Sequence, residues 1–397
     1  MESVEIKEDI YWVGSVDWSI RNFHGYSTHQ GTTYNTFLAV DEKTVLFDTV
    51  KRDFLDDLLY KIGQVTQPEK IDYLVVDHVE LDHAGSLPEV VDRVKPEKIF
   101  CSPMGEKALR AHFHREDWPC EAVKTGDEIS IGKRTIRFIE TRMLHWPDSM
   151  CSYIKEDRLL ISNDIFGQHW ATSERFDDEV DLSQLIYHAA KYFANIILPY
   201  SPRAVKLLKD IRESGMELDM LATDHGLIWR KHIPEILKSY ETWARQETKS
   251  KALIIFDSMW HSTETMAKSI ADGLLLEGVS VRVLDLKANS RDDIMEQALD
   301  AKGLVFGSPT LNNGMMPLMA DVLSYMKGLK PVGRIGAAFG SYGWGGEAVK
   351  LIEREMEEMK MDIPDPGIRV NYVPTEEDLK RCVELGRKIG KAIKEKT

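Results

Sequence analysis

Residues 75–85, VVDHVELDHAG, place four strong metal ligands within six positions. The four are His78, Glu80, Asp82 and His83. They directly follow an apolar run typical of a buried strand, and a loop after a strand can turn several side chains toward one point. We therefore predict that this segment contributes ligands to a metal site.

Three later segments repeat the pattern, because each carries a metal-binding side chain after a strand or a short turn. They are MLHWPDS with His145, LLISNDIFG with Asp164 and LATDHGLIW with His225. The combined set of four imidazoles and three carboxylates predicts a dinuclear site with Asp164 as the candidate bridge. His112 and His114, in AHFHRED, are expected at an exposed helix end and are not assigned to the site.

The ligand order H-x-E-x-D-H, followed by a later His, Asp and His, resembles the metallo-β-lactamase fold. Zinc hydrolases of that fold have a histidine where this chain has Glu80. Nitrogen-rich sites suit zinc, whereas added carboxylates favour harder metals such as iron or manganese. The substitution therefore favours iron. A zinc-dependent hydrolase fused to a second domain is the alternative.

A different chemistry is predicted for DSMWHSTETMAK, residues 257–268, where a strand runs into a helix. Its hydroxyls, its backbone N–H groups and the positive end of the helix dipole suit a bound phosphate. Two further loops, GSPTLNNGMMP and GSYGWGGEA, follow later strands, and their small residues let backbone amides approach a ligand. Three such loops at the switch point of a parallel sheet favour FMN, and the pattern resembles flavodoxin.

The residues predicted to contact FMN all belong to these three loops. They are Ser258, Met259, Trp260, His261, Ser262 and Thr263 in the first; Ser308, Pro309, Thr310, Leu311, Asn312, Asn313 and Gly314 in the second; and Ser341, Tyr342, Gly343, Trp344, Gly345 and Gly346 in the third. The aromatic members can flank a flat ring. Residues 258–263 of the first loop contain no lysine or arginine.

The elements around the metal ligands mix strands with helices. Residues 34–40 and 44–50 predict a hairpin, 54–65 a helix and 71–76 a buried strand. Residues 125–141 predict a second hairpin, and 158–164 and 218–226 predict strands that end in polar residues. A helical segment over 182–214, broken near Pro199 and Pro202, lies between those two strands.

The rest of the chain alternates regularly. Residues 241–251, ETWARQETKSK, lack an apolar stripe and are predicted to be the linker. Five strand–helix units follow, which predicts a doubly wound five-stranded parallel sheet. We therefore predict an α/β protein with a metallo-β-lactamase-like αββα sandwich over residues 1–246 and a flavodoxin-like FMN-binding domain over 247–397.

The composition limits the classes of partner. The 397 residues are 43% hydrophobic and 29% charged, as expected for a globular protein of two or three domains. The net charge of −14 argues against nucleic-acid and anionic-membrane surfaces, and no apolar run reaches the ~18 residues of a membrane span. The acidic N-terminus lacks a signal-peptide pattern, and four scattered cysteines predict free thiols, so we expect a cytoplasmic protein.

The two halves together resemble the flavodiiron proteins over nearly the whole chain. The resemblance implies FMN and two non-haem irons. By that match, one iron is held by His78, Glu80 and His145, the other by Asp82, His83 and His225, with Asp164 bridging. Some members leave the position of His83 uncoordinated. The resemblance also places His24 and Tyr192 near the irons, where they would supply protons or orient the gas.

The family reduces O2 to water, NO to nitrous oxide, or both, with electrons passed through FMN. The resemblance implies an external donor, rubredoxin or reduced coenzyme F420 (F420H2), because no rubredoxin module is expected in this simplest class. It also implies a head-to-tail homodimer or a homotetramer built from such dimers, in which the FMN of one subunit serves the irons of its partner. A non-enzymatic electron carrier with a structural metal is the second alternative.

Overall fold

A computed structural model describes residues 2–397 and divides them into two compact units. The first contains the chain up to Tyr192 together with Pro202–Glu241, and the second contains Phe193–Ser201 and Thr242–Thr397. Within the second unit, Asn195 donates to the carbonyl of Asp292 and accepts from the hydroxyl of Tyr325. The predicted single boundary after residue 246 stays a prediction.

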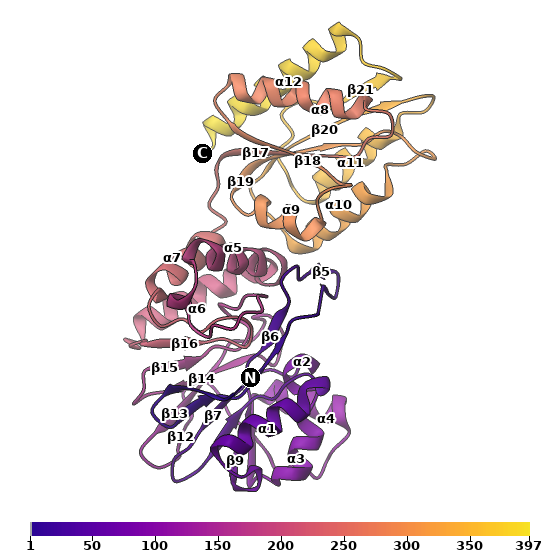
Figure 1. Cartoon of the computed structure of the whole chain (residues 1–397). Helices are drawn as coiled ribbons and strands as arrows, with labels where there is room; N and C mark the ends of the chain where they lie inside the picture. The colour runs from indigo at the N-terminus through magenta and orange to yellow at the C-terminus, as the bar shows by residue number, and fades with distance from the viewer. Residues whose placement is uncertain (1) are drawn as a thin grey trace. The chain divides into compact units, whose positions relative to one another are not determined.

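The first sheet of the N-terminal unit has seven strands in the order β1-β2-β7-β8-β9-β10-β11. They are β1 (Val4–Lys7), β2 (Ile10–Trp12), β7 (Phe37–Ala39), β8 (Val45–Phe47), β9 (Tyr73–Val76), β10 (Lys98–Cys101) and β11 (Cys120–Ala122). The pair β7–β8 is the predicted antiparallel hairpin, and β8 to β11 run parallel. Helices α1 (Leu55–Val65), α3 (Leu87–Val94) and α4 (Pro103–Phe113) cover the outer face of this sheet (Figure 1).

The second sheet has five strands, β12 (Glu128–Ser130), β13 (Thr135–Glu140), β14 (Met150–Ile154), β15 (Leu159–Ile161) and β16 (Met220–Ala222), in chain order. Its inner face packs on the first sheet in one core, where Phe47 and Phe100 meet Phe138 and Met150. Helices α5 (Leu182–Tyr192), α6 (Ser201–Glu213) and α7 (Ile233–Ala244) lie on its outer side (Figure 1). The predicted αββα sandwich is therefore confirmed.

Smaller elements complete the N-terminal unit. The short strand pairs are β3 (Ser15–Asp17) with β6 (Thr32–Tyr34) and β4 (Asn22–Phe23) with β5 (Tyr26–Ser27). Helix α2 (Leu81–Ala84) is one turn long, and 3-10 turns span Arg52–Phe54, Pro68–Lys70 and Asp177–Glu179. The predicted break in the long helical segment is confirmed, because a π-helical turn (Phe193–Ile197) and a 3-10 turn (Leu198–Tyr200) separate α5 from α6.

The second unit contains a parallel sheet in the order β18-β17-β19-β20-β21, as the alternation predicts. Its strands are β17 (Lys249–Phe256), β18 (Ser280–Asp285), β19 (Ala301–Gly307), β20 (Ile335–Tyr342) and β21 (Ile368–Asn371). Helices α8 (Ser262–Leu276) and α12 (Glu376–Glu395) cover one face, and α9 (Arg291–Ala298), α10 (Pro317–Leu329) and α11 (Glu347–Glu358) cover the other (Figure 1). Burial on both faces explains why the central strands are continuous apolar runs.

Two further expectations can be compared with the fold. The predicted linker is shorter than its sequence indicates, since α7 ends at Ala244 and β17 begins at Lys249. Three of its charged residues, Arg245, Glu247 and Lys249, are exposed. All four cysteines are free thiols, as predicted. Among the described residues, no helix is both long and apolar enough to cross a membrane.

Candidate active site

The loop after β9 carries the first four predicted ligands. Asp48 fixes this loop, because its carboxylate accepts hydrogen bonds from the backbone N–H of Asp77 at 2.9 Å and of His78 at 3.4 Å. Glu80 is the N-cap residue of α2, so the chain turns sharply there and continues as one helical turn. The turn places Glu80 Oε2 3.3 Å from His78 Nε2, and Asp82 Oδ2 3.3 Å from His83 Nε2.

The first cluster of side chains surrounds one oxygen of Asp164. The Nε2 atom of His145 lies 3.1 Å from Asp164 Oδ2, and that of His78 lies 3.4 Å from the same oxygen. Glu80 Oε2 is 3.3 Å from His78 Nε2 and 3.4 Å from His145 Nε2. These ligand atoms of four residues all lie within 4.8 Å of one another, a spacing that one metal ion can span.

The second cluster surrounds the other oxygen of Asp164. The Nε2 atoms of His83 and His225 each lie 3.4 Å from Asp164 Oδ1. Asp82 Oδ2 is 3.1 Å from His225 Nε2 and 3.3 Å from His83 Nε2. The structure thus brings together all seven residues that the sequence singled out. It turns one Asp164 oxygen toward each cluster, as a bridging carboxylate requires.

The far ring nitrogens of two histidines have hydrogen-bond partners that fix the ring orientation. His78 Nδ1 lies 2.9 Å from Asp148 Oδ2, and His225 Nδ1 lies 2.6 Å from the carbonyl oxygen of Thr33. His83 Nδ1 lies 3.6 Å from Asp224 Oδ2, too far for a hydrogen bond, and has no hydrogen-bond partner among the described residues. A carbonyl can only accept, so His225 carries its proton on Nδ1 and leaves the Nε2 lone pair free to bind a metal.

A cavity of about 600 Å³ opens over Glu80 and Asp82. Its wall includes the exposed ring of His24, together with Trp146, whose ring centroid lies 5.3 Å from that of His78. His112 also lines it, at the exposed end of α4. This cavity connects the two clusters with solvent.

The first predicted flavin loop lies between β17 and α8. Ser258 is buried and its hydroxyl makes no hydrogen bond among the described residues. No side chain caps the N-terminus of α8, so its first backbone N–H groups stay available for an anion. Thr263 is fully buried in the first turn, and its hydroxyl lies 3.1 Å from that of Ser341 in the third loop.

The other two loops follow β19 and β20, the next strands in the sheet. The backbone N–H of Thr310 donates to the carbonyl of Ser341, which ties these loops together. Gly346 has a φ of +84°, and a Cβ there would come within 3.1 Å of the Tyr342 ring. All three loops therefore lie at the carboxyl edge of three neighbouring strands, where doubly wound sheets bind their ligands.

Comparison with known proteins agrees with both predicted kinds of domain, the metallo-β-lactamase-like one and the flavodoxin-like one. The flavodoxin family matches residues 254–386, and the family described as ODP family beta lactamase matches residues 32–226. The chain is 46% identical to a nitric oxide reductase of Moorella thermoacetica, over 99% of each sequence. The solved rubredoxin oxygen:oxidoreductase of Desulfovibrio gigas is 44% identical with a TM-score of 0.98, over 100% of this chain and 99% of that one. The flavodiiron protein of Giardia intestinalis is 34% identical with a TM-score of 0.96, over 100% and 97%.

The chain belongs to the flavodiiron proteins. Its residues fit the cofactors of that family, FMN and a non-haem diiron site. Buried Asp82 Oδ1, His83 Nε2 and Asp164 Oδ1 make no hydrogen bond among the described residues, although buried polar atoms nearly always have a partner. Metal ions facing these atoms would supply the missing contacts. The free hydroxyl of Ser258 and the uncapped end of α8 fit the FMN phosphate in the same way.

The structure locates the two further residues that the resemblance implied. Tyr192 is buried beside the clusters, with its ring centroid 6.0 Å from that of His225. Burial, followed by the charge of Asp164 and a hydrogen bond to it, raises the pKa of Tyr192 well above its usual range. His24 instead lies at the surface of this flavodiiron chain, on the cavity wall.

Sequence reasoning missed several residues around the two sites. Asp148 and Asp224 lie inside the ligand motifs, but only the folded chain shows which imidazole each one contacts. Lys287 contacts the first flavin loop, donating to the carbonyl of Ser258 and lying 3.4 Å from Asp257, so the loop does have a cation beside it. His261 is exposed and pairs with Glu264 at 2.7 Å.

Carboxylates outnumber cations around the metal clusters, and this excess controls protonation. Burial alone lowers the pKa of His78, yet hydrogen bonds to Asp148 and Glu80 outweigh burial and hold that pKa well above its usual range. For the carboxyl group of Asp48, burial itself raises the pKa, to about 7. The metal-free flavodiiron chain therefore keeps protons that an unfolded chain would lose.

The stability of the metal-free protein should fall as the pH rises from 7 to 9. A histidine whose folded pKa is raised stabilises the fold fully below its ordinary pKa of 6.5, and this contribution disappears as pH rises through the folded value. We expect a fall in Tm of a few degrees, because 1 kcal/mol shifts Tm by about 2–4 °C in a domain of about 150–250 residues. Calorimetry on the metal-free protein measures it. Ferrous iron should raise Tm more at pH 9 than at pH 7, because metal replaces the protons. A metal-free Tm that rises with pH would contradict this account.

Proposed function

We propose that this flavodiiron protein reduces O2 to water, NO to nitrous oxide, or both, with electrons that arrive through FMN. The observation that carries the proposal is the two-sided position of Asp164, which faces one ligand cluster with each oxygen. The relatives with the names nitric oxide reductase and rubredoxin oxygen:oxidoreductase support it, because they match this chain along almost its full length.

The proposed ligand roles follow the two clusters. His78, Glu80 and His145 would hold one iron, and Asp82, His83 and His225 the other, with Asp164 shared. Bound iron would supply the redox chemistry and the affinity for the gas. Glu80 favours iron over zinc, because it replaces an imidazole nitrogen with an oxygen ligand.

The remaining roles belong to residues beside the clusters. Tyr192 is buried beside the clusters, and the charge of Asp164 helps to raise its pKa, so we assign it a role in orienting the shared carboxylate. Trp146 packs against the His78 ring and forms an apolar part of the cavity wall. His24 is exposed on the same cavity wall, so we assign it proton supply.

Gas consumption under anaerobic mixing tests the proposal. The protein, loaded with iron and FMN, is given reduced rubredoxin or F420H2, and the loss of O2 or NO is followed with electrodes. We propose one of these two donors, and the faster reaction identifies it. Loss of either gas at a rate set by the protein concentration is the expected result. Zinc in the protein as prepared, with hydrolysis of an ester or lactam and no gas consumption, would favour the hydrolase alternative.

We further propose a cytoplasmic head-to-tail homodimer, alone or paired into a tetramer. Electron transfer needs FMN and iron close together. The flavin loops carry two indoles that are 87% and 84% exposed, Trp260 and Trp344, and beside the metal cavity Leu81 is 51% exposed. Apolar side chains exposed at both sites suit an interface that joins the FMN of one subunit to the irons of the other.

Mixing two inactive variants tests this arrangement. One lacks the metal centre (Asp164→Asn) and the other lacks FMN (Ser258→Ala with Thr263→Val). After subunit exchange, a head-to-tail dimer contains one intact pair of sites, so gas consumption should return. If each chain served its own irons, the mixture would remain inactive although sedimentation showed dimers.

A further inference from the structure

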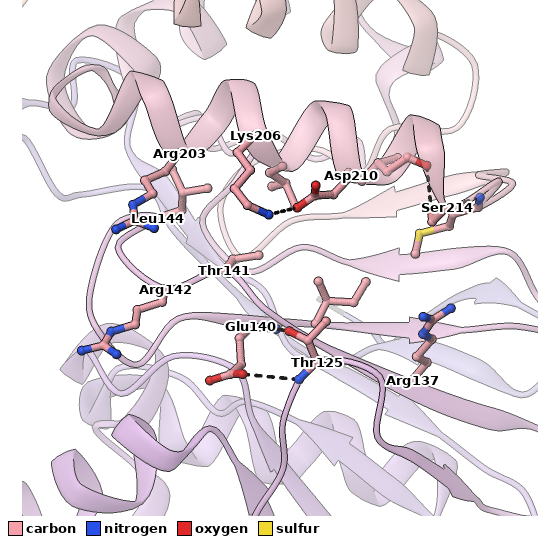
Figure 2. Close-up of a pocket in the computed structure, with 14 residues that line it drawn as sticks. Thr125, Arg137, Glu140, Thr141, Arg142, Leu144, Arg203, Lys206, Asp210 and Ser214 are labelled. Carbon is pink, nitrogen blue, oxygen red and sulfur yellow. Dashed lines mark hydrogen bonds and ion pairs between the residues drawn. The ribbon is translucent and has the colours of Figure 1, made fainter.

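A second cavity lies in the N-terminal unit between β13 and α6, with residues unlike those of the metal cavity. Figure 2 shows the residues that line it. Its volume is about 290 Å³. Five apolar side chains line it: Ile139, Leu144, Leu207, Ile211 and Met216. Leu144, Leu207 and Ile211 are buried, so the floor of the cavity is fixed by the packing of the helix on the sheet.

Four cationic side chains and two carboxylates, Glu140 and Asp210, line this cavity. Arg137, Arg142 and Arg203 line it, and none forms an ion pair with a carboxylate in the described part of the chain. Lys206 does have a partner, since it pairs with Asp210 one helical turn further along α6. Three unpaired guanidinium groups at one cavity are unexpected in a chain with a net charge of −14.

Two of the three arginines lie at one end of the cavity and the third lies toward the other end. Figure 2 shows Arg142 and Arg203 at the same end of the cavity as Leu144, and Arg137 toward the other end. Arg142 and Arg203 come from a loop and from a helix 61 positions later in the sequence, so the fold brings them together. Planar guanidinium groups bind carboxylates through paired hydrogen bonds.

We propose that this cavity binds a small amphiphilic carboxylate. The carboxylate would lie between Arg142 and Arg203, and its apolar body would cover Leu207 and Ile211. A volume of 290 Å³ holds about ten non-hydrogen atoms, taking roughly 30 Å³ for each from the volume of liquid water. A linear carboxylate of eight carbons matches that size.

A ligand bound in this cavity should stabilise the turn that carries one of the proposed iron ligands. Leu144 is 2% exposed and directly precedes His145, and its backbone N–H donates to the carbonyl of Thr141 at 2.8 Å. A ligand on Leu144 would therefore hold the turn that carries His145. This part rests on the proposed role of His145 as an iron ligand. Binding to the cavity does not.

Calorimetry of the iron- and FMN-loaded protein with octanoate tests the site. We expect one octanoate per chain, with affinity at least tenfold lower for acetate, which has no apolar body, and for 1-octanol, which has no charge. The variant Arg142→Gln with Arg203→Gln should bind octanoate at least tenfold more weakly, since it loses the charge-assisted hydrogen bonds from both guanidinium groups. Arg282→Gln, at an exposed position of β18, is the matched control and should bind normally.

Three outcomes would overturn the site. If acetate bound as tightly as octanoate, the binding would reflect surface charge alone. If 1-octanol bound as tightly, the cavity would be an unspecific apolar cleft. If the Arg282 variant lost as much affinity as the double arginine variant, the loss would be a general effect of net charge. Coupling to the metal centre is measured separately, as the rate of iron loss to a chelator. Octanoate should slow that rate in the native protein but not in the double arginine variant. An unchanged rate, with octanoate bound, would overturn the coupling alone.

Discussion

Replacing Asp164 by Asn should remove the dinuclear metal centre while FMN stays bound. Each carboxylate oxygen lies between 3.1 and 3.4 Å from two imidazole nitrogens, and an amide keeps only one oxygen and turns an NH2 group toward the other cluster. We expect at most one iron per chain. Gas consumption should fall at least about 100-fold, because even residues that only orient metal ligands cost 10–100-fold when replaced. Elemental analysis and the flavin absorbance measure the two cofactors independently.

The matched control for this change is Asp219→Asn. Asp219 is half-exposed and makes only long ion pairs, at 3.7 Å to Lys7 and 3.9 Å to Arg158, so its replacement should leave iron and turnover unchanged. Two irons per chain and native turnover in the Asp164 variant would show that the shared carboxylate does not hold the metals.

The complementary result is expected at the flavin loops. Ser258→Ala combined with Thr263→Val should release FMN and leave iron bound. Both hydroxyls are buried near the first turn of α8, where the Ser258 hydroxyl has no hydrogen-bond partner among the described residues and Thr263 has only Ser341. Loss of two hydrogen bonds to a charged phosphate, at about 1.5 kcal/mol or more each, should weaken FMN binding about 100-fold or more. Fluorescence titration of the flavin-free protein with FMN measures it.

Ser280→Ala, at the exposed start of β18, is the control for removal of a hydroxyl from the same domain. It should bind FMN normally. Gas consumption by the double variant should return in excess FMN, because the metal centre is intact. Native FMN affinity in the double variant would mean that the phosphate is held elsewhere.

The sequence by itself determined the two kinds of site in this flavodiiron protein. His78, Glu80, Asp82 and His83 follow β9 directly, so their closeness along the chain keeps them at one end of that strand, in the loop and the short helix α2. The regular alternation of apolar strands and helices after residue 248 likewise specifies a parallel sheet, because such a pattern buries its strands on both faces. These features are local, so they can be read in a linear chain.

Only the tertiary structure decided which atoms face each other. The carboxylate of Asp164 divides its oxygens between two clusters, and Asp148 contacts His78 across 70 positions of sequence, because the two sheets of the sandwich bring their strand ends together. Arg142 and Arg203 meet at one cavity for the same reason, since α6 packs on the sheet that holds β13. Such distances depend on packing between elements, and no spacing along the chain encodes them.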